Sequence, residues 1–512
     1  MDTQRIRRNI APLRLRSNSN QSCMLTAEQT SIAITNQVYV SSEIGTLRRV
    51  MVHSPDSGLG KVVPSKAQDW LFEDIVHLDT MRREEYDLYI KILLYFLDPA
   101  KIKGRLSEVD APENNRNFYK PEHPEYFNSD KVIDPQYLLS HILEDEKVRL
   151  RLLAAICAVE RCSYSIQEFL ATLPSKELSK TLISGTLPDK TMIFAPIPNF
   201  IFTRDIGITI NGHVLLNKPA KIARTREALL TQYIFHNHPV FSHLLDKIIE
   251  IPESEHHFLL PDGEKDYKKA TLEGGDVMMV SPNHLLIGLS ERTSPYAINQ
   301  VIKILFEKEI VEKVTVIKIP KKRDYMHIDT IFTQVKRNVW VLLGTLSRKG
   351  DELEKRDFME SLQEVKSSER LNIMQFVRGY GDKPVHYEYL EDLLDDISRN
   401  DLGCKEKTVF VYSGNNEFPF GAREQWTDSC NLLTIKEGVC IAYDRNDKTI
   451  EAFKQAGFKA MPAAELINSL EAGELTPGDV RDTIILLPSA ELSRARGGSH
   501  CMSMPLLRDQ LV

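Results

Sequence analysis

Apolar residues in the first third of the chain recur mostly at helical spacing. A short strand-like run at 47–53 (LRRVMVH) is followed by two segments with apolar residues every three or four positions, 86–97 (YDLYIKILLYFL) and 137–162 (YLLSHILEDEKVRLRLLAAICAVERC). That period is typical of amphipathic helices, and β-branched alternation is scarce between them. The polar stretch 112–134, which contains proline and asparagine, interrupts the pattern as a loop. The sequence therefore predicts a helical module over residues 67–183.

After residue 191 the pattern changes to pairs of short apolar strands joined by turns. Four such strand–turn–strand units are each followed by helix-like or charged sequence, which indicates an internal repeat. The units open at Asp205 (DIGITINGHVLLNKPA), Asp276 (DVMMVSPNHLLIGLS), Asp329 (DTIFTQVKRNVWVLLG) and Asn431 (NLLTIKEGVCIAYD).

A repeat of this kind favours radial or stacked packing, because one unit cannot bury its own apolar face. The strand near Leu47 and the segment 483–506 could together supply a fifth unit. The first position of each unit is Asp, Asp, Asp and then Asn. Equivalent positions of a radial array meet, so we expect several carboxylates to converge on one pocket.

Composition narrows the class of protein. The 512 residues are 42% hydrophobic and 27% charged, with 65 basic against 72 acidic side chains and a formal net charge of -7. This balance gives no reason to expect nucleic-acid binding, which usually needs a strongly basic domain. We also find no apolar run long enough to span a membrane. The seven cysteines include no CxxC pair, which is typical of a reducing compartment and disfavours a cysteine-based zinc site. We therefore expect a cytoplasmic protein.

The first residues form a basic stretch without acidic residues between Asp2 and Glu28. We expect residues 1–36 to be a disordered basic leader. The alternative is organellar import, because an Arg- and Ser-containing, acid-poor composition is also typical of transit peptides.

Four segments carry candidate chemistry: 198–205 (PNFIFTRD), 272–276 (LEGGD), 326–330 (MHIDT) and 496–508 (RGGSHCMSMPLLR). Each is weak alone, since paired glycines are often turns and a histidine or cysteine in apolar sequence is often core. Together they supply the groups that attack on a guanidinium requires. Carboxylates bind its planar fork of donors, a thiolate attacks its carbon, and a histidine moves protons. No metal or cofactor is needed for this chemistry.

In this order, FTRD, EGGD, MHIDT and RGG-x-HCMSMPL resemble the arginine deiminase family of the guanidino-group-modifying (pentein) superfamily. EIGTLRRVMVHSP, WLFEDI and REQWTD resemble further blocks of the family, so the similarity runs from about Glu43 to the C-terminus. The resemblance implies an α/β fold, a five-bladed α/β propeller formed by 37–66 and 184–512, with 67–183 as an inserted helical domain.

The resemblance also implies roles for nine residues. The catalytic set is Cys501 as nucleophile, His327 as general acid and base, Asp205 and Asp329 as guanidinium ligands, and Glu273 beside the histidine. The residues implied to hold the carboxylate and α-amino end of the substrate, or to lie near the nucleophile on a loop, are Asn199, Arg224, Arg292 and Arg496. Two other residues of these segments have simpler interpretations. Asp276 could have no chemical role and simply cap its turn, and Arg204 is expected to be a structural ion-pair partner.

The predicted reaction is hydrolysis of L-arginine to L-citrulline and ammonia through a covalent cysteine intermediate. An amidinotransferase or an arginine dihydrolase could use the same site, and a catalytically silent arginine-binding scaffold is the alternative from another class. The charged segment within 347–407 reads as an exposed helix beyond the usual family length. We expect a homo-oligomer that binds L-arginine and neither nucleic acid nor membrane.

Overall fold

The structure is a computed structural model that describes residues 37–71, 74–254, 259–261, 269–322, 324–348, 350, 371–381 and 383–511. The predicted disordered leader, 1–36, lies outside the described residues, as does most of the charged segment predicted as an exposed helix between 347 and 371.

The four predicted hairpins are present as antiparallel strand pairs. Each pair is joined by a tight turn at the polar residues that interrupt its apolar pattern. The pairs are β3 (Gly207–Ile210) with β4 (His213–Leu216), β6 (Val277–Ser281) with β7 (His284–Leu289), β9 (Phe332–Lys336) with β10 (Val339–Leu342), and β14 (Leu433–Lys436) with β15 (Val439–Tyr443).

Between each hairpin and a third strand, which runs parallel to the second strand of the pair, the chain forms a helix. The helices are α8 (Thr225–Asn237), α10 (Pro295–Glu307), α12 (Leu390–Asp396) and α14 (Asp447–Gln455). The third strands are β5 (Ile248–Ile249), β8 (Lys313–Lys318), β13 (Val409–Tyr412) and β17 (Thr483–Leu487). The repeat predicted from the sequence is therefore confirmed as a mixed α/β unit.

Helix α10 illustrates how such a unit is held together. Ser294 caps its first turn by accepting a hydrogen bond from the N–H of Ala297, and proline opens the helix. Ile298, Val301 and Leu305 are buried in one apolar cluster with residues of β7 and β8. Their helical spacing puts them on one face, so burying that face fixes the helix on its sheet.

The fifth sheet joins distant parts of the chain. The strand β1 (Leu47–Met51) pairs antiparallel with β18 (Met504–Arg508) and parallel with β2 (Val132–Ile133). The prediction that the leading strand and the closing segment form a fifth unit is confirmed for 504–508. It is wrong for Thr483–Leu487, which instead pairs with β15 and β16 (Lys459–Pro462) in the fourth sheet. The described residues thus form five separate sheets.

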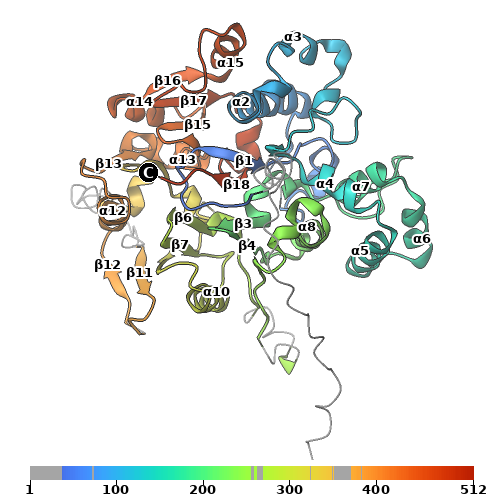
Figure 1. Cartoon of the computed structure of the whole chain (residues 1–512), viewed down its shortest axis with the longest axis horizontal. Helices are drawn as coiled ribbons and strands as arrows, with labels where there is room; N and C mark the ends of the chain where they lie inside the picture. The colour runs from blue at the N-terminus through green and yellow to red at the C-terminus, as the bar shows by residue number, and fades with distance from the viewer. Residues whose placement is uncertain are drawn as a thin grey trace, which may run out of the picture. The chain divides into compact units, whose positions relative to one another are not determined.

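Residues 67–183 are mainly helical, and Figure 1 shows α4 to α7 grouped beside α8. The helices are α2 (Asp87–Leu97), α3 (Leu106–Val109), α4 (Pro135–Ile142), α5 (Glu146–Val159), α6 (Tyr164–Thr172) and α7 (Ser175–Ser184). The predicted helical run 137–162 is broken after Leu143. Asp145 accepts a hydrogen bond from the N–H of Val148 and so starts α5 as a new helix.

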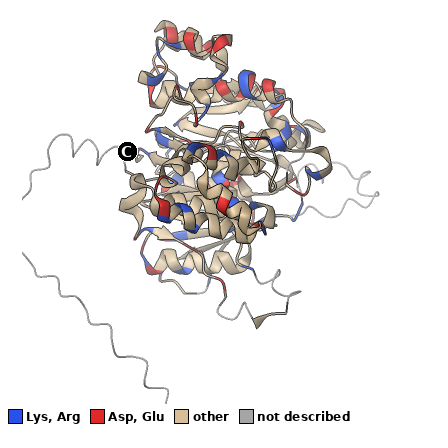
Figure 2. Cartoon of the chain, turned by 90° about the vertical axis from the view of Figure 1, so that its right-hand side faces the viewer, with Lys and Arg blue, Asp and Glu red and all other residues tan. Residues whose placement is uncertain are grey.

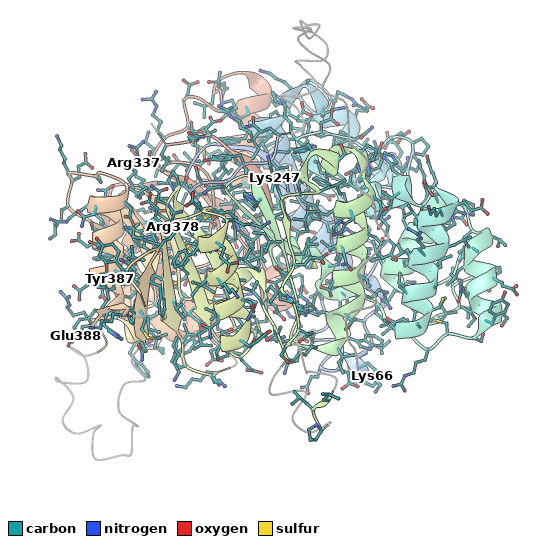
Figure 3. The ribbon with its side chains drawn as sticks, turned by 60° about the horizontal axis from the view of Figure 1, so that its bottom comes forward. Lys66, Lys247, Arg337, Arg378, Tyr387 and Glu388 are labelled. Atoms are coloured by element: carbon teal, nitrogen blue, oxygen red, sulfur yellow. The ribbon has the colours of Figure 1, made fainter. Side chains whose placement is uncertain are left out.

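The strands β11 (Asn372–Val377) and β12 (Val385–Tyr387) extend the second sheet, and β16 extends the fourth. Two more helices are α13 (Phe420–Trp426) and α15 (Ala463–Ala472). Tyr387, labelled in Figure 3, lies on β12 at the edge of its sheet and donates a hydrogen bond to Asp396 of α12 at 2.8 Å. Figure 2 shows basic and acidic residues interspersed along the helices and strands of this face. Within the described ranges, no helix has both the length and the apolar character needed to cross a bilayer.

The acidic residues that open the first three hairpins lie in short 3-10 turns. Asp205 lies in η8 (Thr203–Ile206), Asp276 in η12 (Gly274–Asp276) and Asp329 in η13 (Ile328–Thr330). The turn η12 contacts both η8 and η13. The convergence predicted from the repeat is therefore present, and it defines the place where the functional side chains meet.

Candidate active site

A cavity of about 350 Å³ lies at this meeting point. Eight of the nine predicted site residues line it: Asn199, Asp205, Arg224, Glu273, Arg292, His327, Arg496 and Cys501. The ninth, Asp329, is completely buried and lies directly behind the thiol. The sequence motifs, which are up to about 300 positions apart, thus come together around one pocket.

Cys501 lies in the loop between η18 (Leu492–Ala495) and β18. Its backbone N–H donates to Oδ1 of Asn431 at 3.0 Å, and its Sγ is 3.6 Å from Oδ2 of Asp329. Burial raises the pKa of this thiol well above its usual value, and the negative charges of Asp329 and Asp205 raise it further. A cation placed among these carboxylates would favour the thiolate.

Asp329 has one carboxylate oxygen that is buried without a hydrogen-bond partner in the described part of the chain. Its Oδ2 pairs with Nδ1 of His500 at 2.9 Å, whereas its Oδ1 has no hydrogen-bond partner among the described residues. Burial would raise the pKa of Asp329, but the hydrogen bond from His500 and the nearby charges of His327 and Arg204 together outweigh it, so the pKa is lowered. An ionised carboxylate with a buried free oxygen is suited to accept from a guanidinium.

His327 lies between two carboxylates. Its Nε2 is 3.1 Å from Oε2 of Glu273, and its Nδ1 is 3.9 Å from Oδ1 of Asp205. Burial lowers the pKa of His327, but the charge of Asp205 and the hydrogen bond to Glu273 outweigh it and raise the pKa to about 10. The imidazole ring therefore carries a proton at neutral pH and can act as a general acid.

Glycine is required beside this ring. A Cβ on Gly275 would lie 2.5 Å from Nδ1 of His327, closer than side-chain atoms tolerate. The backbone N–H of Gly275 also donates to Oδ1 of Asp205 at 3.2 Å. The Gly274-Gly275 pair in the LEGGD segment thus lets the chain pass close to both groups.

Arg224 is tied to three carboxylates. Its Nη1 is 2.7 Å from Oδ2 of Asp205 and 3.5 Å from Oε2 of Glu273, and its Nε donates to Glu227 at 2.8 Å. Its Nη2 is buried and has no partner among the described residues. Arg224 therefore compensates the acidic cluster and still presents one nitrogen as a donor.

Two of the remaining predicted ligands, Asn199 and Arg292, line the cavity next to this cluster. Asn199 donates from its side chain to the backbone carbonyl of Trp70 at 2.9 Å. Nη1 of Arg292 is 3.8 Å from Oε1 of Glu273, an ion pair longer than a hydrogen bond. Arg292 can therefore turn toward an anion without breaking a close contact.

Arg496 stacks on an aromatic ring. Its guanidinium carbon is 3.4 Å from the ring centroid of Trp426, and its Nη1 donates to the backbone carbonyl of Trp426 at 3.4 Å. Its backbone adopts a left-handed conformation with φ 65°, directly before two glycines. The stacking gives this loop arginine a defined position beside Cys501.

Asp276 does not face the cavity. Its side chain accepts hydrogen bonds from the hydroxyls of Ser290 and Thr293 at 2.5 and 2.7 Å, and from the N–H of Ile328 at 3.1 Å. These contacts tie the second hairpin to the segment that carries His327. The simpler interpretation of Asp276 as a structural residue therefore agrees with its contacts.

Sequence reasoning missed a buried charged group beneath the site. Glu43 is 3.3 Å from Nε2 of His500 and 3.3 Å from Nη1 of Arg204, which is the structural ion pair expected for Arg204. The signal was present, because Arg204 precedes Asp205 and His500 precedes Cys501, each one position before a predicted catalytic residue. The side chains of Arg204 and His500 point away from the cavity and pair with Glu43 beneath it.

Among the described residues, one cluster has spacing that could hold a metal ion. Ligand atoms of Asp205, Glu273 and His327 lie within 4.8 Å of one another. The guanidinium of Arg224 already places a positive charge 2.7 Å from Asp205. The raised pKa of His327 also means that a metal would have to displace a proton. Both features disfavour a metal ion at these atoms.

The fold and the cavity define a class: an α/β protein whose pocket presents a thiol, an imidazole and carboxylates to a cationic substrate. The family model for arginine deiminase matches residues 170–508. The chain belongs to the arginine deiminase family, and the resemblance predicted from the motifs is confirmed. This membership supports the predicted enzyme class, a hydrolase acting on amidines.

The chain aligns with known arginine deiminases over nearly their whole length. The chain is 27% identical to an arginine deiminase from Borreliella afzelii over 488 residues, covering 93% of this chain and 99% of the relative. It is 26% identical over 489 residues to one from Treponema denticola, with the same coverage. Among solved structures it is similar to SxtG, an amidinotransferase from Microseira wollei, with a TM-score of 0.44, 12% identity, and coverage of 93% of this chain and 98% of that one.

Proposed function

We propose that this protein hydrolyses L-arginine to L-citrulline and ammonia, with Cys501 as nucleophile and His327 as general acid and base. The observation that carries the proposal is that one cavity of about 350 Å³ is lined by Cys501, His327, Asp205 and Glu273. Family membership supports the reaction, and the geometry supports the assignment of the residues.

In the first half of the reaction, the substrate guanidinium lies between Asp205 and the free Oδ1 of Asp329. Its positive charge offsets the carboxylates that raise the pKa of Cys501, so the thiolate becomes accessible. The thiolate adds to the guanidinium carbon and forms a carbon–sulfur bond. His327 gives its proton to one amino group, which leaves as ammonia, and a thiouronium cation bound to Cys501 remains.

In the second half, neutral His327 takes a proton from water while the water oxygen bonds to the thiouronium carbon. The tetrahedral adduct collapses with cleavage of the carbon–sulfur bond, which returns the Cys501 thiolate. The proton lost as the ureido carbonyl forms goes to the released ammonia. The overall balance is arginine plus water to citrulline plus ammonium.

The other end of the substrate is assigned to Asn199, Arg224 and Arg292, whereas Arg496 is assigned to the loop beside Cys501. The unpaired Nη2 of Arg224 and the loosely held Arg292 are suited to donate hydrogen bonds to a carboxylate. A salt bridge at this end would hold the amino acid so that its guanidinium reaches the thiol.

The test is product analysis with arginine as the sole substrate. Citrulline and ammonia in equal amounts support the proposal, ornithine with two ammonia indicates a dihydrolase, and no product without an added amine indicates an amidinotransferase. The variant Cys501→Ala should fold and release no citrulline. Citrulline formation by that variant would exclude Cys501 as nucleophile.

We also propose that the five sheets are the blades of a five-bladed α/β propeller formed by 37–66 and 184–512, with 67–183 as an inserted helical domain. The five sheets, each with an antiparallel pair and a parallel strand, support this arrangement. A homo-oligomer in the cytoplasm remains a prediction, for which light scattering of the purified protein and localisation of a tagged chain are the tests.

A further inference from the structure

The fourth hairpin opens with Asn431, where the first three open with aspartate. Asn431 is 1% exposed and lies between the nucleophile loop and the turn that carries Asp329. The repeat places it with the acidic residues of the site, but neither the proposed reaction nor the predicted ligand set uses it.

Both ends of its side-chain amide are engaged. Oδ1 accepts from the backbone N–H of Cys501 at 3.0 Å, and Nδ2 donates to the backbone carbonyl of Asp329 at 3.2 Å. A backbone N–H can only donate and a carbonyl can only accept, so these partners fix the orientation of the amide. One side chain thus joins the two residues whose Sγ and Oδ2 are 3.6 Å apart.

The backbone around Asn431 strengthens this connection. Its own carbonyl accepts from the N–H of His500 at 3.4 Å. A Cβ on Gly498 would lie 2.4 Å from the Asn431 carbonyl oxygen and 2.7 Å from its Oδ1, so the nucleophile loop packs directly on this residue. The loop follows the left-handed residue Arg496 and passes through two glycines, and Asn431 restrains its position at the nucleophile.

We propose that Asn431 is a positioning residue that fixes the Cys501 thiol relative to the guanidinium-binding carboxylate of Asp329. Aspartate would not replace it, for two reasons. A carboxylate has no donor for the Asp329 carbonyl. It would also add negative charge beside a thiol whose pKa the neighbouring carboxylates already raise. The change from Asp to Asn at the fourth repeat position is therefore a functional requirement.

This inference rests on the proposed function, and its test separates the two. The variants Asn431→Leu and Asn431→Asp remove both contacts and the donor contact, respectively. Displacement of reacting atoms by about 1 Å lowers rates about 10²-fold, so we expect kcat for citrulline formation to fall by about that factor. The KM for arginine should stay within about threefold, because the carboxylate end of the site is untouched.

A second readout does not require turnover. Alkylation of Cys501 by iodoacetamide, followed by peptide mass spectrometry across pH, reports the thiol directly. Asn431→Asp should slow it near neutral pH by raising the thiol pKa. The control is Asn338→Leu, which removes a buried asparagine that donates to the Lys407 carbonyl at 3.1 Å, at the far end of the third hairpin. It should leave kcat and alkylation unchanged.

In a third variant, Gly498→Ala, the added Cβ pushes the nucleophile loop away from Asn431. It should lower kcat although Asn431 itself is unchanged. If any folded variant of the three keeps kcat within about threefold of the parent, the proposal is overturned, whatever the fate of the other two. A parent protein that makes no citrulline would instead overturn the proposed function.

Discussion

Nη1 of Arg224 lies 2.7 Å from Oδ2 of Asp205, so the carboxylate assigned to the substrate guanidinium already holds a guanidinium. Glu227 and Glu273 share the same arginine at 2.8 and 3.5 Å. Arg224 is therefore part of the frame of the site as well as a candidate ligand, and the charge of the pocket depends on it.

Replacing Arg224 by alanine should destabilise the whole protein. Three buried carboxylates would lose their shared partner, and breaking a buried ion pair from one side costs about 3–5 kcal/mol. Urea unfolding of Arg224→Ala measures the loss. The matched control is Arg399→Ala, whose pair with Asp395 is largely exposed and should contribute about 0–1 kcal/mol. Equal stability of the two variants would contradict the framing role.

Replacing Asp329 by asparagine should change two rates in opposite directions: alkylation of Cys501 should become faster and citrulline formation slower. Asp329→Asn removes a negative charge 3.6 Å from Sγ of Cys501, so the thiol pKa should fall and alkylation by iodoacetamide near neutral pH should become faster. Citrulline formation should nevertheless fall at least about 10²-fold, because the guanidinium loses its charged acceptor. Slower alkylation in this variant would show that the charge of Asp329 does not control the thiol.

The pair of His327 and Glu273 predicts a pH dependence of stability. The pKa of His327 is raised to about 10 in the folded protein, so its contribution is complete below about 6.5 and is lost as pH rises through about 10. The pKa of Glu273 is lowered in the folded protein, so its contribution to stability is present at every pH above the usual pKa of a glutamate. The stability difference between the parent and His327→Asn should be largest near pH 6 and shrink toward pH 10. Urea unfolding at the two pH values checks this, and a constant difference would contradict it.

A methyl group next to the histidine should disable the site while leaving the fold intact. Gly275→Ala places a Cβ 2.5 Å from Nδ1 of His327, and the ring must move to avoid it. We expect kcat to fall about 10²-fold. Gly212→Ala is the control, since a Cβ there meets nothing within 4 Å, and its kcat should match the parent. Steady-state kinetics of both variants, with melting curves, separates the local effect from unfolding.

Local patterns predicted much of this structure. Apolar strands around turns identified four hairpins, and the leading Asp residues indicated that Asp205, Asp276 and Asp329 would meet. The break after Leu143 was hidden because the apolar spacing continues across it. The prediction that Thr483–Leu487 belongs to the fifth unit was wrong, because the apolar pattern of a short strand does not determine which sheet it joins.

The site was less predictable where contacts join distant segments. Asn431 was recognised as a repeat position, but its role depends on the Cys501 N–H and the Asp329 carbonyl, about 70 and 102 positions away. The pairing of Arg224 with three acids likewise depends on tertiary packing. A motif identifies which functional groups are present, whereas their hydrogen-bond partners can be identified only from the three-dimensional structure.

The pairing of β1 with β18 has a consequence for biogenesis. Arg48 of β1 and Asp509, directly after β18, bond to each other and are 461 positions apart, so β1 can pair with β18 only after all the intervening chain has been made. Contacts so distant in sequence form slowly, because a long loop has to close first. Cys501 lies in the segment that leads into β18, so a nascent chain cannot assemble its reactive thiol early. Catalytic competence should appear in a single late step during synthesis.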